Sequence, residues 1–573
     1  MMTKKIMFGA VVVLLSGSTA LAQTQYDAAR IMDTDLNGTA RFVGMGGAMS
    51  ALGGEISTIG SNPAGIGLYR SNDFSGTISL NDTEVKSDFA GVTGKDNRSR
   101  MSFDQLGVVF SNKIGNETTV RYVNVGVNYR KQRNFNRRAV MYGNLEGMSL
   151  SDQIAHLANN VYDEKEREYL PLLESDYYKM YDNPEGNYYT DDRYRYVSWL
   201  GILGATGGII SPQYTPIQQK DDNGNLIFDE QGNPLYEVDE YGNLLYEYNY
   251  VGIGGNDVKY KSQETGGINV FDFNLSANVN DRVYWGLTVE FHDVNYRRSS
   301  LYSETFDAFN EIGIPTDFVL NNDFLTEGSG VNAKLGVIFR PLEESAFRMG
   351  LAIHTPTLYK LSERYSASLS VLEEGEMYKP YTEVATFDYD LVTPWKFNFS
   401  LGHTIGTSVA LGSDYEYTDY SSAELRYDDG FEMANENDWV NEYLKGVHTV
   451  RVGAEVKVIP EFSLRAGYNY SSSVFEKDSY RSFFYDDTRT DAEYENMMAR
   501  NTFTLGMGFR SGQLYLDAAF LYTNQKSEFY PFDSWFSYND ALVDYPTTAD
   551  GLLPPTKMTN ERTQLLLTVG YRF

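Results

Sequence analysis

The stretch that decides the fold runs from residue 271 to residue 292 and reads FDFNLSANVNDRVYWGLTVEFH. Apolar and polar residues alternate in each half, and an Asn280-Asp281 turn separates the halves. Because successive side chains of a strand point to opposite faces, this period of two predicts a β-hairpin with one apolar and one polar face. Each arm has about ten residues, which is enough for a tilted strand to cross a membrane.

The same alternation recurs along the chain and predicts about fourteen antiparallel strands, an even number, as single-chain bacterial barrels have. The predicted strands are 72–82, 100–111, 118–131, 267–279, 283–299, 328–340, 346–372, 380–405, 407–426, 446–458, 462–476, 500–510, 514–526 and 561–573. The connections at 112–117, 280–282, 341–345, 406, 459–461 and 511–513 are short, and the alternate ones are long and acidic. A soluble sandwich has no reason to sort its loops this way. The predicted fold is therefore all-β, a transmembrane antiparallel β-barrel over residues 72–573 with short periplasmic turns.

The N-terminus has the pattern of a cleaved export signal. Lys4 and Lys5 precede an apolar run over residues 6–15, and Ala20-Leu21-Ala22 has the small residues of a cleavage site. The apolar run is too short to remain in a bilayer as an anchor. Residues 1–22 are therefore predicted to be a signal peptide, and the barrel is predicted to lie in the outer membrane of a Gram-negative cell.

The composition excludes several classes of protein. The chain has no cysteine, which excludes disulfides, thiolate metal sites, cysteine nucleophiles and the lipid anchor of a lipoprotein. A net charge of −30 argues against nucleic acid as a partner. Acidic outer loops would instead suit divalent cations that bridge to lipid and lipopolysaccharide head groups. The mean hydropathy of −0.41 fits a barrel whose strands alternate lipid-facing and lumen-facing residues.

One predicted connection, residues 132–266, is much longer than the rest and is expected outside the cell. Apolar residues from Leu150 to Val161 recur at helical spacing. The apolar run 197–210 could capture a greasy ligand or pack the loops onto the barrel, and we favour packing because buried apolar area usually stabilises structure. Gly-Asn pairs at 224–225, 232–233 and 242–243 predict successive turns.

Residues 23–71 contain many small residues and show no strand alternation. Residues 41–48 read RFVGMGGA and residues 62–65 read NPAG. Since glycines allow close backbone approach, we expect this segment to fold compactly inside the barrel as a plug. Here the sequence resembles the FadL/TodX family of outer-membrane channels for long-chain fatty acids and aromatic hydrocarbons. The resemblance extends to residues 347–357, 393–397 and 451–455.

The resemblance implies that residues 23–71 form an N-terminal hatch, with hatch or gating roles for Asn62, Pro63 and Ala64. It implies passive, hatch-gated diffusion of hydrophobic small molecules of the long-chain fatty acid type, with lateral exit through a gap in the barrel wall. The ligand-contacting residues of the family do not align, so the ligand-binding residues stay unassigned. The long insertion departs from the family pattern, and so acidic a chain does not favour a fatty carboxylate at its surface. The C-terminal Phe573 fits the usual ending of outer-membrane proteins and is expected to engage the barrel-assembly machinery.

Two other classes of function remain open. A FadL-like barrel could instead serve as a docking or assembly partner for secreted or surface proteins through its loops. An outer-membrane enzyme is disfavoured, because the five histidines form no H-E-x-x-H motif and the chain has no G-x-S-x-G elbow. No catalytic residue, metal site or cofactor is therefore predicted. A TonB-dependent receptor is disfavoured because its plug needs far more chain than precedes the first predicted strand.

Overall fold

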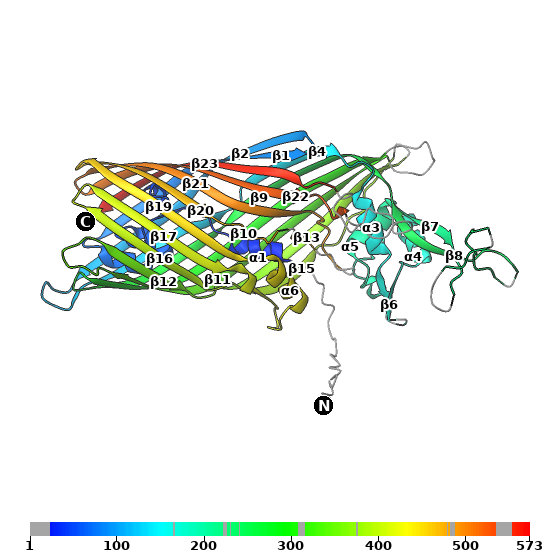
Figure 1. Cartoon of the computed structure of the whole chain (residues 1–573), viewed down its shortest axis with the longest axis horizontal. Coiled ribbons are helices and arrows are strands. Elements are labelled where there is room, and N and C mark those ends of the chain that lie inside the picture. Colours follow the sequence, from blue (N-terminus) through cyan, green and yellow to red (C-terminus); the bar gives the residue numbers. More distant parts are fainter. Residues whose placement is uncertain are drawn as a thin grey trace, which may run out of the picture.

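The computed structural model describes residues 23–163, 165, 167–221, 226–229, 231–239, 241–306, 316–373, 376–477, 479–481, 487–534 and 553–573. Within these residues the chain forms a closed barrel, with a folded cap at one end (Figure 1). The predicted signal peptide, residues 1–22, lies outside the described residues. No described helix is long and apolar enough to span a membrane.

The barrel has fourteen antiparallel strands in the described part of the chain, which confirms the predicted fold. Ten strands are single segments: β1 (Asp73–Phe89), β2 (Val92–Lys113), β9 (Gly255–Val279), β10 (Val283–Phe306), β11 (Asp317–Phe339), β19 (Gly446–Ile459), β20 (Phe462–Ser471), β21 (Tyr494–Ser511), β22 (Leu514–Tyr530) and β23 (Thr556–Arg572). Four consist of two segments each: β3 (Val120–Asn134) with β4 (Arg137–Asn144), β12 (Arg348–His354) with β13 (Leu358–Glu373), β15 (Ala385–Val392) with β16 (Lys396–Ile405), and β17 (Val409–Asp419) with β18 (Glu424–Tyr427).

Pairing of the first strand with the last closes the barrel. β1 pairs with β2 on one side and with β23 on the other, and Asp73 lies opposite Arg572. Asn72 N donates to Phe573 O at 3.0 Å, and Phe573 N donates to Asn72 O at 3.1 Å. The barrel therefore begins and ends at the same rim, the rim that carries the short turns.

The outer face of the barrel carries an apolar belt next to the short turns. On β10 the outward residues Trp285, Leu287 and Phe291 are exposed, and the next outward residues, Asp293 and Asn295, are polar. The same change occurs on β1 after Leu80. Because a lipid-facing surface must be apolar over the hydrocarbon thickness, this belt is the membrane-spanning part of the wall, and the strands continue beyond it.

Several predicted strand limits are wrong at the end away from the short turns. The predicted long loop between residues 82 and 100 is a tight turn at Ala90-Gly91, because β1 and β2 remain paired far above the belt. The prediction missed this because the apolar face changes from outside to inside at the edge of the belt. On β10, for example, the outward Phe291 is followed by the inward, buried Val294 and Tyr296. This change shifts the period-two pattern by one residue, so that the pattern resembles the end of a strand.

Three predicted strands are interrupted in the structure. The predicted strand 407–426 is broken at residues 420–423, between β17 and β18. The predicted strand 346–372 is broken at Pro356, and the predicted strand 380–405 begins later, at Ala385, and is broken at Pro394. Proline has no backbone N–H to give to a sheet, which accounts for the two breaks at prolines.

The long insertion is shorter than the predicted range 132–266, since β4 and the first half of β9 belong to the barrel. It contains α3 (Leu150–Ala158), β5 (Val161–Asp163), β6 (Glu168–Leu170), α4 (Glu174–Asp182), η3 (Asp192–Tyr194), α5 (Trp199–Gly207), β7 (Ile210–Pro216) and β8 (Tyr246–Gly252). The helix predicted near residue 150 is α3. We call residues 145–254 the cap, because the described residues of this range fold over the end of the barrel away from the short turns (Figure 1).

The apolar run 197–210 packs the cap onto the barrel, as predicted. It forms α5, whose residues are all buried. Trp199 contacts the ring of Tyr365 on β13, and a side chain at Gly207 would overlap Leu369 on the same strand. The predicted turns at Gly232 and Gly242 have positive φ, as turn glycines do, whereas residues 224–225 lie outside the described part of the chain.

Candidate functional site

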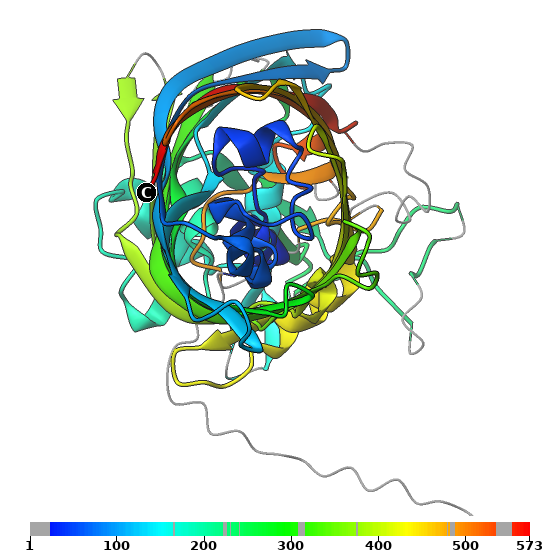
Figure 2. The same ribbon diagram turned by 90° about the vertical axis from the view of Figure 1, so that its left-hand side faces the viewer.

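The N-terminal segment lies inside the ring of strands, as the dark blue ribbon in Figure 2 shows. We call residues 23–71 the plug. It contains α1 (Gln25–Met32), α2 (Ala40–Gly44), η1 (Ile56–Gly60) and η2 (Pro63–Leu68), and most of its side chains are buried. The barrel lumen is therefore filled over the height of the apolar belt. A hatch function for this segment is a proposal taken up below.

Inward-facing glycines of the wall let the plug approach it closely. A Cβ at Gly286 on β10 or Gly336 on β11 would overlap the plug at residues 62–64, and one at Gly350 would lie 2.9 Å from Asn62 Nδ2. Gly453 on β19 and Gly467 on β20 meet the backbone of plug residues 45–46 in the same way. Sequence reasoning missed these wall residues, although glycine inside a strand is a known sign of close backbone approach.

The structure brings the predicted hatch residues together on the wall where β10, β11 and β12 meet. Asn62 is fully buried and caps η2, with its Oδ1 accepting from Ala64 N at 3.1 Å. Its Nδ2 donates to Val337 O and Leu351 O, both at 3.4 Å. Pro63 occupies the first turn of η2, where its missing N–H costs nothing. One side chain therefore fixes the plug to two neighbouring strands.

Ion pairs fix the plug to strands on other sides of the barrel. Asp35 contacts Arg562 on β23 at 2.7 Å and Arg133 on β3 at 2.9 Å. Asp33 contacts the same Arg133 at 2.7 Å and Arg500 on β21 at 3.1 Å. We call these five residues the arginine clamp. Buried charges are costly unless they are paired, so the plug cannot leave its place without breaking several strong contacts.

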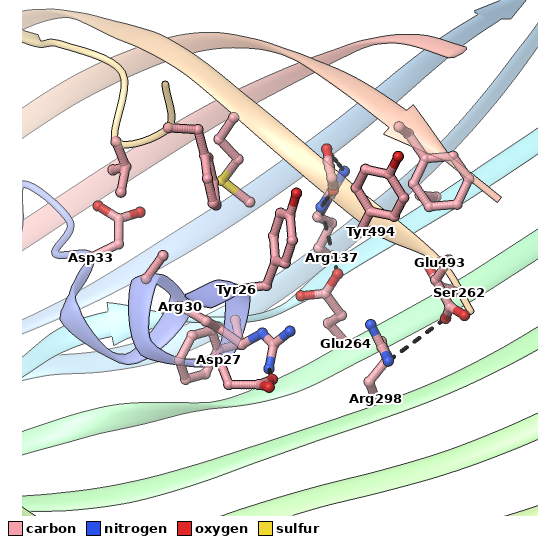
Figure 3. Close-up of a pocket in the computed structure, with 18 of the residues that line it drawn as sticks. Tyr26, Asp27, Arg30, Asp33, Arg137, Ser262, Glu264, Arg298, Glu493 and Tyr494 are labelled. Atoms are coloured by element: carbon pink, nitrogen blue, oxygen red, sulfur yellow. Dashed lines mark hydrogen bonds and ion pairs between the residues drawn. The ribbon is translucent and has the colours of Figure 1, made fainter. Parts of the chain in front are cut away.

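A cavity lies between α1 and the strands of the wall (Figure 3). Its lining residues on β10, Tyr296 and Arg298, lie beyond the apolar belt. We call this cavity the outer chamber. Its described lining mixes aromatic and aliphatic side chains with seven arginines and six carboxylates. The apolar members include Tyr26, Phe135, Tyr260, Tyr296, Phe475, Tyr494, Met497, Phe529 and Met558, and the charged members are Arg30, Arg133, Arg137, Arg298, Arg481, Arg489, Arg500, Asp27, Asp33, Glu264, Asp491, Glu493 and Glu495.

The charges of the outer chamber are mostly paired with one another. Arg137 contacts Glu495 at 2.6 Å, and Arg489 contacts Asp27 at 2.6 Å. The Nε atoms of Arg137 and Arg298 are nevertheless buried without a hydrogen-bond acceptor among the described residues. The chamber therefore offers aromatic surface and unused cationic donors in one space. This combination suits a molecule with an apolar body and an anionic group.

Two further cavities lie along one side of the plug. The middle chamber shares Asp33, Ser471 and Arg500 with the outer chamber. The wall chamber shares a second set of lining residues with the middle chamber: Thr34, Gln132, Lys334, Lys396, Thr418 and Tyr420. The three cavities therefore adjoin one another from α1 down to the wall near Pro394. Their residues are scattered over the whole chain, so no local sequence pattern could have identified them.

Comparison with known proteins finds similarity to solved structures but no match by sequence. No protein-family model and no curated protein matches the sequence. Among solved structures, a Pseudomonas aeruginosa FadL homologue is 13% identical with a TM-score of 0.47, covering 95% of this chain and 99% of that chain. The Pseudomonas putida toluene transporter TodX is 10% identical with a TM-score of 0.42, covering 94% and 99%. The Ralstonia pickettii toluene transporter TbuX is 11% identical with a TM-score of 0.42, covering 94% and 99%.

Proposed function

We propose that this protein carries hydrophobic small molecules of the long-chain fatty acid type across the outer membrane by passive diffusion through the barrel. The observation that carries this proposal is the outer chamber, which joins aromatic surface to arginine donors above the membrane. A fatty acid has an apolar chain and one carboxylate, the two features that this lining can bind. The net charge of −30 argues against binding of a carboxylate at the surface of the chain. In the lining of the outer chamber, however, arginines slightly outnumber carboxylates.

We further propose that the plug acts as a hatch and that the ligand leaves sideways through the wall. The adjoining chambers support this route, since they run along the plug from the outer chamber to the wall. A sideways exit suits an apolar ligand, because it passes straight into the hydrocarbon of the membrane and avoids water. Asn62 is the proposed gating contact, since its side chain joins the plug to both β11 and β12.

The chamber is tested by titrating the purified protein with a fluorescent long-chain fatty acid. Ser262→Phe places a large ring in the outer chamber, and we expect it to weaken binding by about tenfold or more, equivalent to roughly 1.4 kcal/mol. Ser299→Phe is the matched control, because Ser299 lies on the neighbouring strand β10 and faces outward. Absence of fatty acid binding to the unaltered protein would overturn the proposal.

The hatch is tested by uptake of a labelled fatty acid into cells. Cells without the protein should take up less label than cells that have it. The double variant Asn62→Ala with Pro63→Ala should change the rate, because the plug loses its tie to β11 and β12. Equal uptake in all three strains would remove fatty acid transport as the function.

The ordered cap favours a second candidate function, docking of a secreted or surface protein. An extensively packed cap covers the outer end of the barrel, although transport alone needs no such structure. The ends of the cap lie together, with Gly147 N donating to Gly255 O at 3.0 Å, so residues 148–253 can be replaced by a tight turn. Unchanged uptake after this replacement, together with loss of a protein from the cell surface, would support docking.

A further inference from the structure

The first described residue of the chain lies buried inside the barrel. Gln23 is 1% exposed, and it directly follows Ala22, the last residue of the predicted export signal. Hydrolysis of the peptide bond between these two residues adds water, and it leaves a carboxylate on Ala22 and a free α-amine on Gln23. Because the ordinary pKa of an α-amine is about 7.7–8.0, this group carries a positive charge at neutral pH. Cleavage of the predicted signal therefore places a new cation in the lumen.

The side chain of Gln23 contacts Glu363 on β13. Gln23 Nε2 donates to Glu363 Oε2 at 3.1 Å. Only a few bonds separate this amide nitrogen from the α-nitrogen of the same residue, so the new cation lies within the length of one side chain from the carboxyl group. The next backbone nitrogen, Thr24 N, donates to Asp27 Oδ2 at 3.0 Å at the start of α1. The end of the mature chain is therefore fixed beside Glu363.

Glu363 is a buried carboxyl group whose described hydrogen bonds all come from neutral donors. Besides Gln23, it accepts from Thr326 Oγ1 at 3.2 Å and from Tyr389 OH at 2.8 Å. It lies beyond the apolar belt, because the outward residues on either side of it are polar. Burial raises the pKa of Glu363 from its ordinary 4.5 to about 7, and the negative charge of Asp27 adds to the rise. A carboxylate at this position therefore needs a cation.

The two arginines whose charge reaches Glu363 are engaged with other carboxylates. Arg489 contacts Asp27 at 2.6 Å and Asp491 at 2.7 Å. Arg30 contacts Asp27 at 2.7 Å. Burying a carboxylate is costly unless it is paired, so Glu363 is short of a counter-charge as long as the signal is attached.

Buried amide oxygens near the new terminus also lack donors. Gln23 Oε1 and Gln25 Oε1 are buried with no hydrogen-bond donor among the described residues. A peptide nitrogen has one N–H, whereas an ammonium group has three. The added donors can serve both the carboxylate of Glu363 and the amide oxygen of Gln23. The positive end of α1 opposes another cation, and Asp27 in its first turn offsets this effect.

We infer that removal of the export signal completes a buried ion pair between the α-ammonium group of Gln23 and the carboxylate of Glu363, and that this pair fixes α1 of the plug to β13. The inference rests on the predicted cleavage after Ala22 and is independent of the ligand that the barrel carries. The pair is absent while the signal is attached, because the nitrogen of Gln23 is then part of a neutral amide. The plug is therefore held more firmly in the mature protein than in its precursor.

Hydrogen exchange of the protein purified from outer membranes tests the ion pair, with mass spectrometry of the peptide that contains α1. A glycine added between Ala22 and Gln23 leaves the cleavage site intact and moves the ammonium group by one residue. This variant and Glu363→Gln should each speed exchange in α1 by about tenfold or more. Together they should do little more than either alone, because both break the same pair. Glu304→Gln is the matched control, since it alters a buried carboxyl group that contacts the cap, and it should leave exchange in α1 unchanged.

A second measurement detects the amine itself, even if a variant disturbs the plug. An amine-selective acylating reagent should label exposed lysines such as Lys95 in the folded protein and leave the α-amine of Gln23 unlabelled. In Glu363→Gln the labelling of Gln23 should rise by about tenfold or more, because the amine loses its partner.

Three results would overturn the ion pair. The mass of the mature chain could show that it begins at a residue other than Gln23. It could be lower by one ammonia, which marks attack of the α-amine on the side-chain amide of Gln23 and leaves a neutral lactam. The effects of the added glycine and of Glu363→Gln on exchange could also add in full, as they would for independent sites.

Discussion

Gly336 shows how single residues of the wall set the position of the plug. It faces inward on β11, and the amide of Asn62 occupies the space where a side chain would stand. Asn62 can reach the carbonyls of two strands only because this space is open. A hydrogen atom in place of a side chain at a few wall positions thus allows a folded segment to lie against a sheet without a gap.

Gly336→Ala should therefore destabilise the plugged barrel. The added methyl group overlaps Asn62 Oδ1 and lies 2.9 Å from Pro63 Cδ, and such overpacking costs about 1–3 kcal/mol. Thermal unfolding in detergent, followed by circular dichroism, measures the loss. Gly76→Ala is the matched control, because the nearest atom to its added Cβ, Leu106 Cδ1, is 3.4 Å away. An equal loss in both variants would show that the plug does not press on Gly336.

Among the elements, α3 shows how the cap is seated on the barrel. Glu304, near the outer end of β10, accepts from Ser149 Oγ at 2.5 Å and from Leu150 N at 2.7 Å, at the start of the helix. Tyr302 also donates to this carboxyl group. The start of a helix has backbone N–H groups without intrahelical partners, and Glu304 supplies one of the missing acceptors from a different element. The side chain of one barrel strand thus positions the first helix of the cap.

The seating of α3 should depend on pH. Burial raises the pKa of Glu304 from its ordinary 4.5 to about 7, with a smaller contribution from Asp152. With the cap folded over it, Glu304 therefore keeps a proton that it releases between these two pKa values when the cap unfolds. The stability of the folded cap falls as pH rises through this window, by up to about 3 kcal/mol. Limited proteolysis of the cap, scaled to cleavage of an unfolded peptide, should be slower at about pH 5 than at about pH 8. Glu304→Gln should flatten this difference, and an unchanged pH dependence in the variant would assign the effect to another group.

For the whole molecule, the arginine clamp joins the plug to three separate strands of the barrel. Arg133, Arg500 and Arg562 come from three strands and meet two aspartates of the plug. The fold therefore brings residues from positions 33 to 562 into one buried charge network. Such a network holds the plug in one place. If the plug moves, these ion pairs must break and the charged groups must find other partners.

Asp35→Asn should loosen the plug and open the barrel to ions. The substitution leaves Arg562 and Arg133 without one anionic partner, and breaking a buried pair in this way costs roughly 3–5 kcal/mol. Conductance of single barrels in a planar lipid bilayer should rise above that of the unaltered protein. Asp257→Asn, which removes the same charge from an exposed site on β9, should leave it unchanged. A closed Asp35→Asn barrel would show that the clamp is dispensable for closure.

Prediction from the sequence succeeded where a local pattern has one physical cause. The hairpin at residues 271–292 was predicted correctly, because lipid on one side and polar lumen on the other force strict alternation. The start of β9 was placed twelve residues too late, at 267 instead of Gly255, because Val258 and Tyr260 face inward above the belt and reverse the pattern. The residues of the outer chamber could not be predicted, since they share no motif and no neighbourhood in the chain.

The sequence by itself determined the class of fold, its approximate number of strands, the helix near residue 150 and the buried role of the run 197–210. Each of these depends on periodicity or composition within a short stretch, which tertiary structure does not alter. Only the tertiary structure decided that Asn62 joins the plug to both β11 and β12, that two proline breaks lie on neighbouring strands and that the chambers adjoin. These features depend on the register between strands far apart in the chain. Register is set by closure of the whole barrel and cannot be predicted from any single segment.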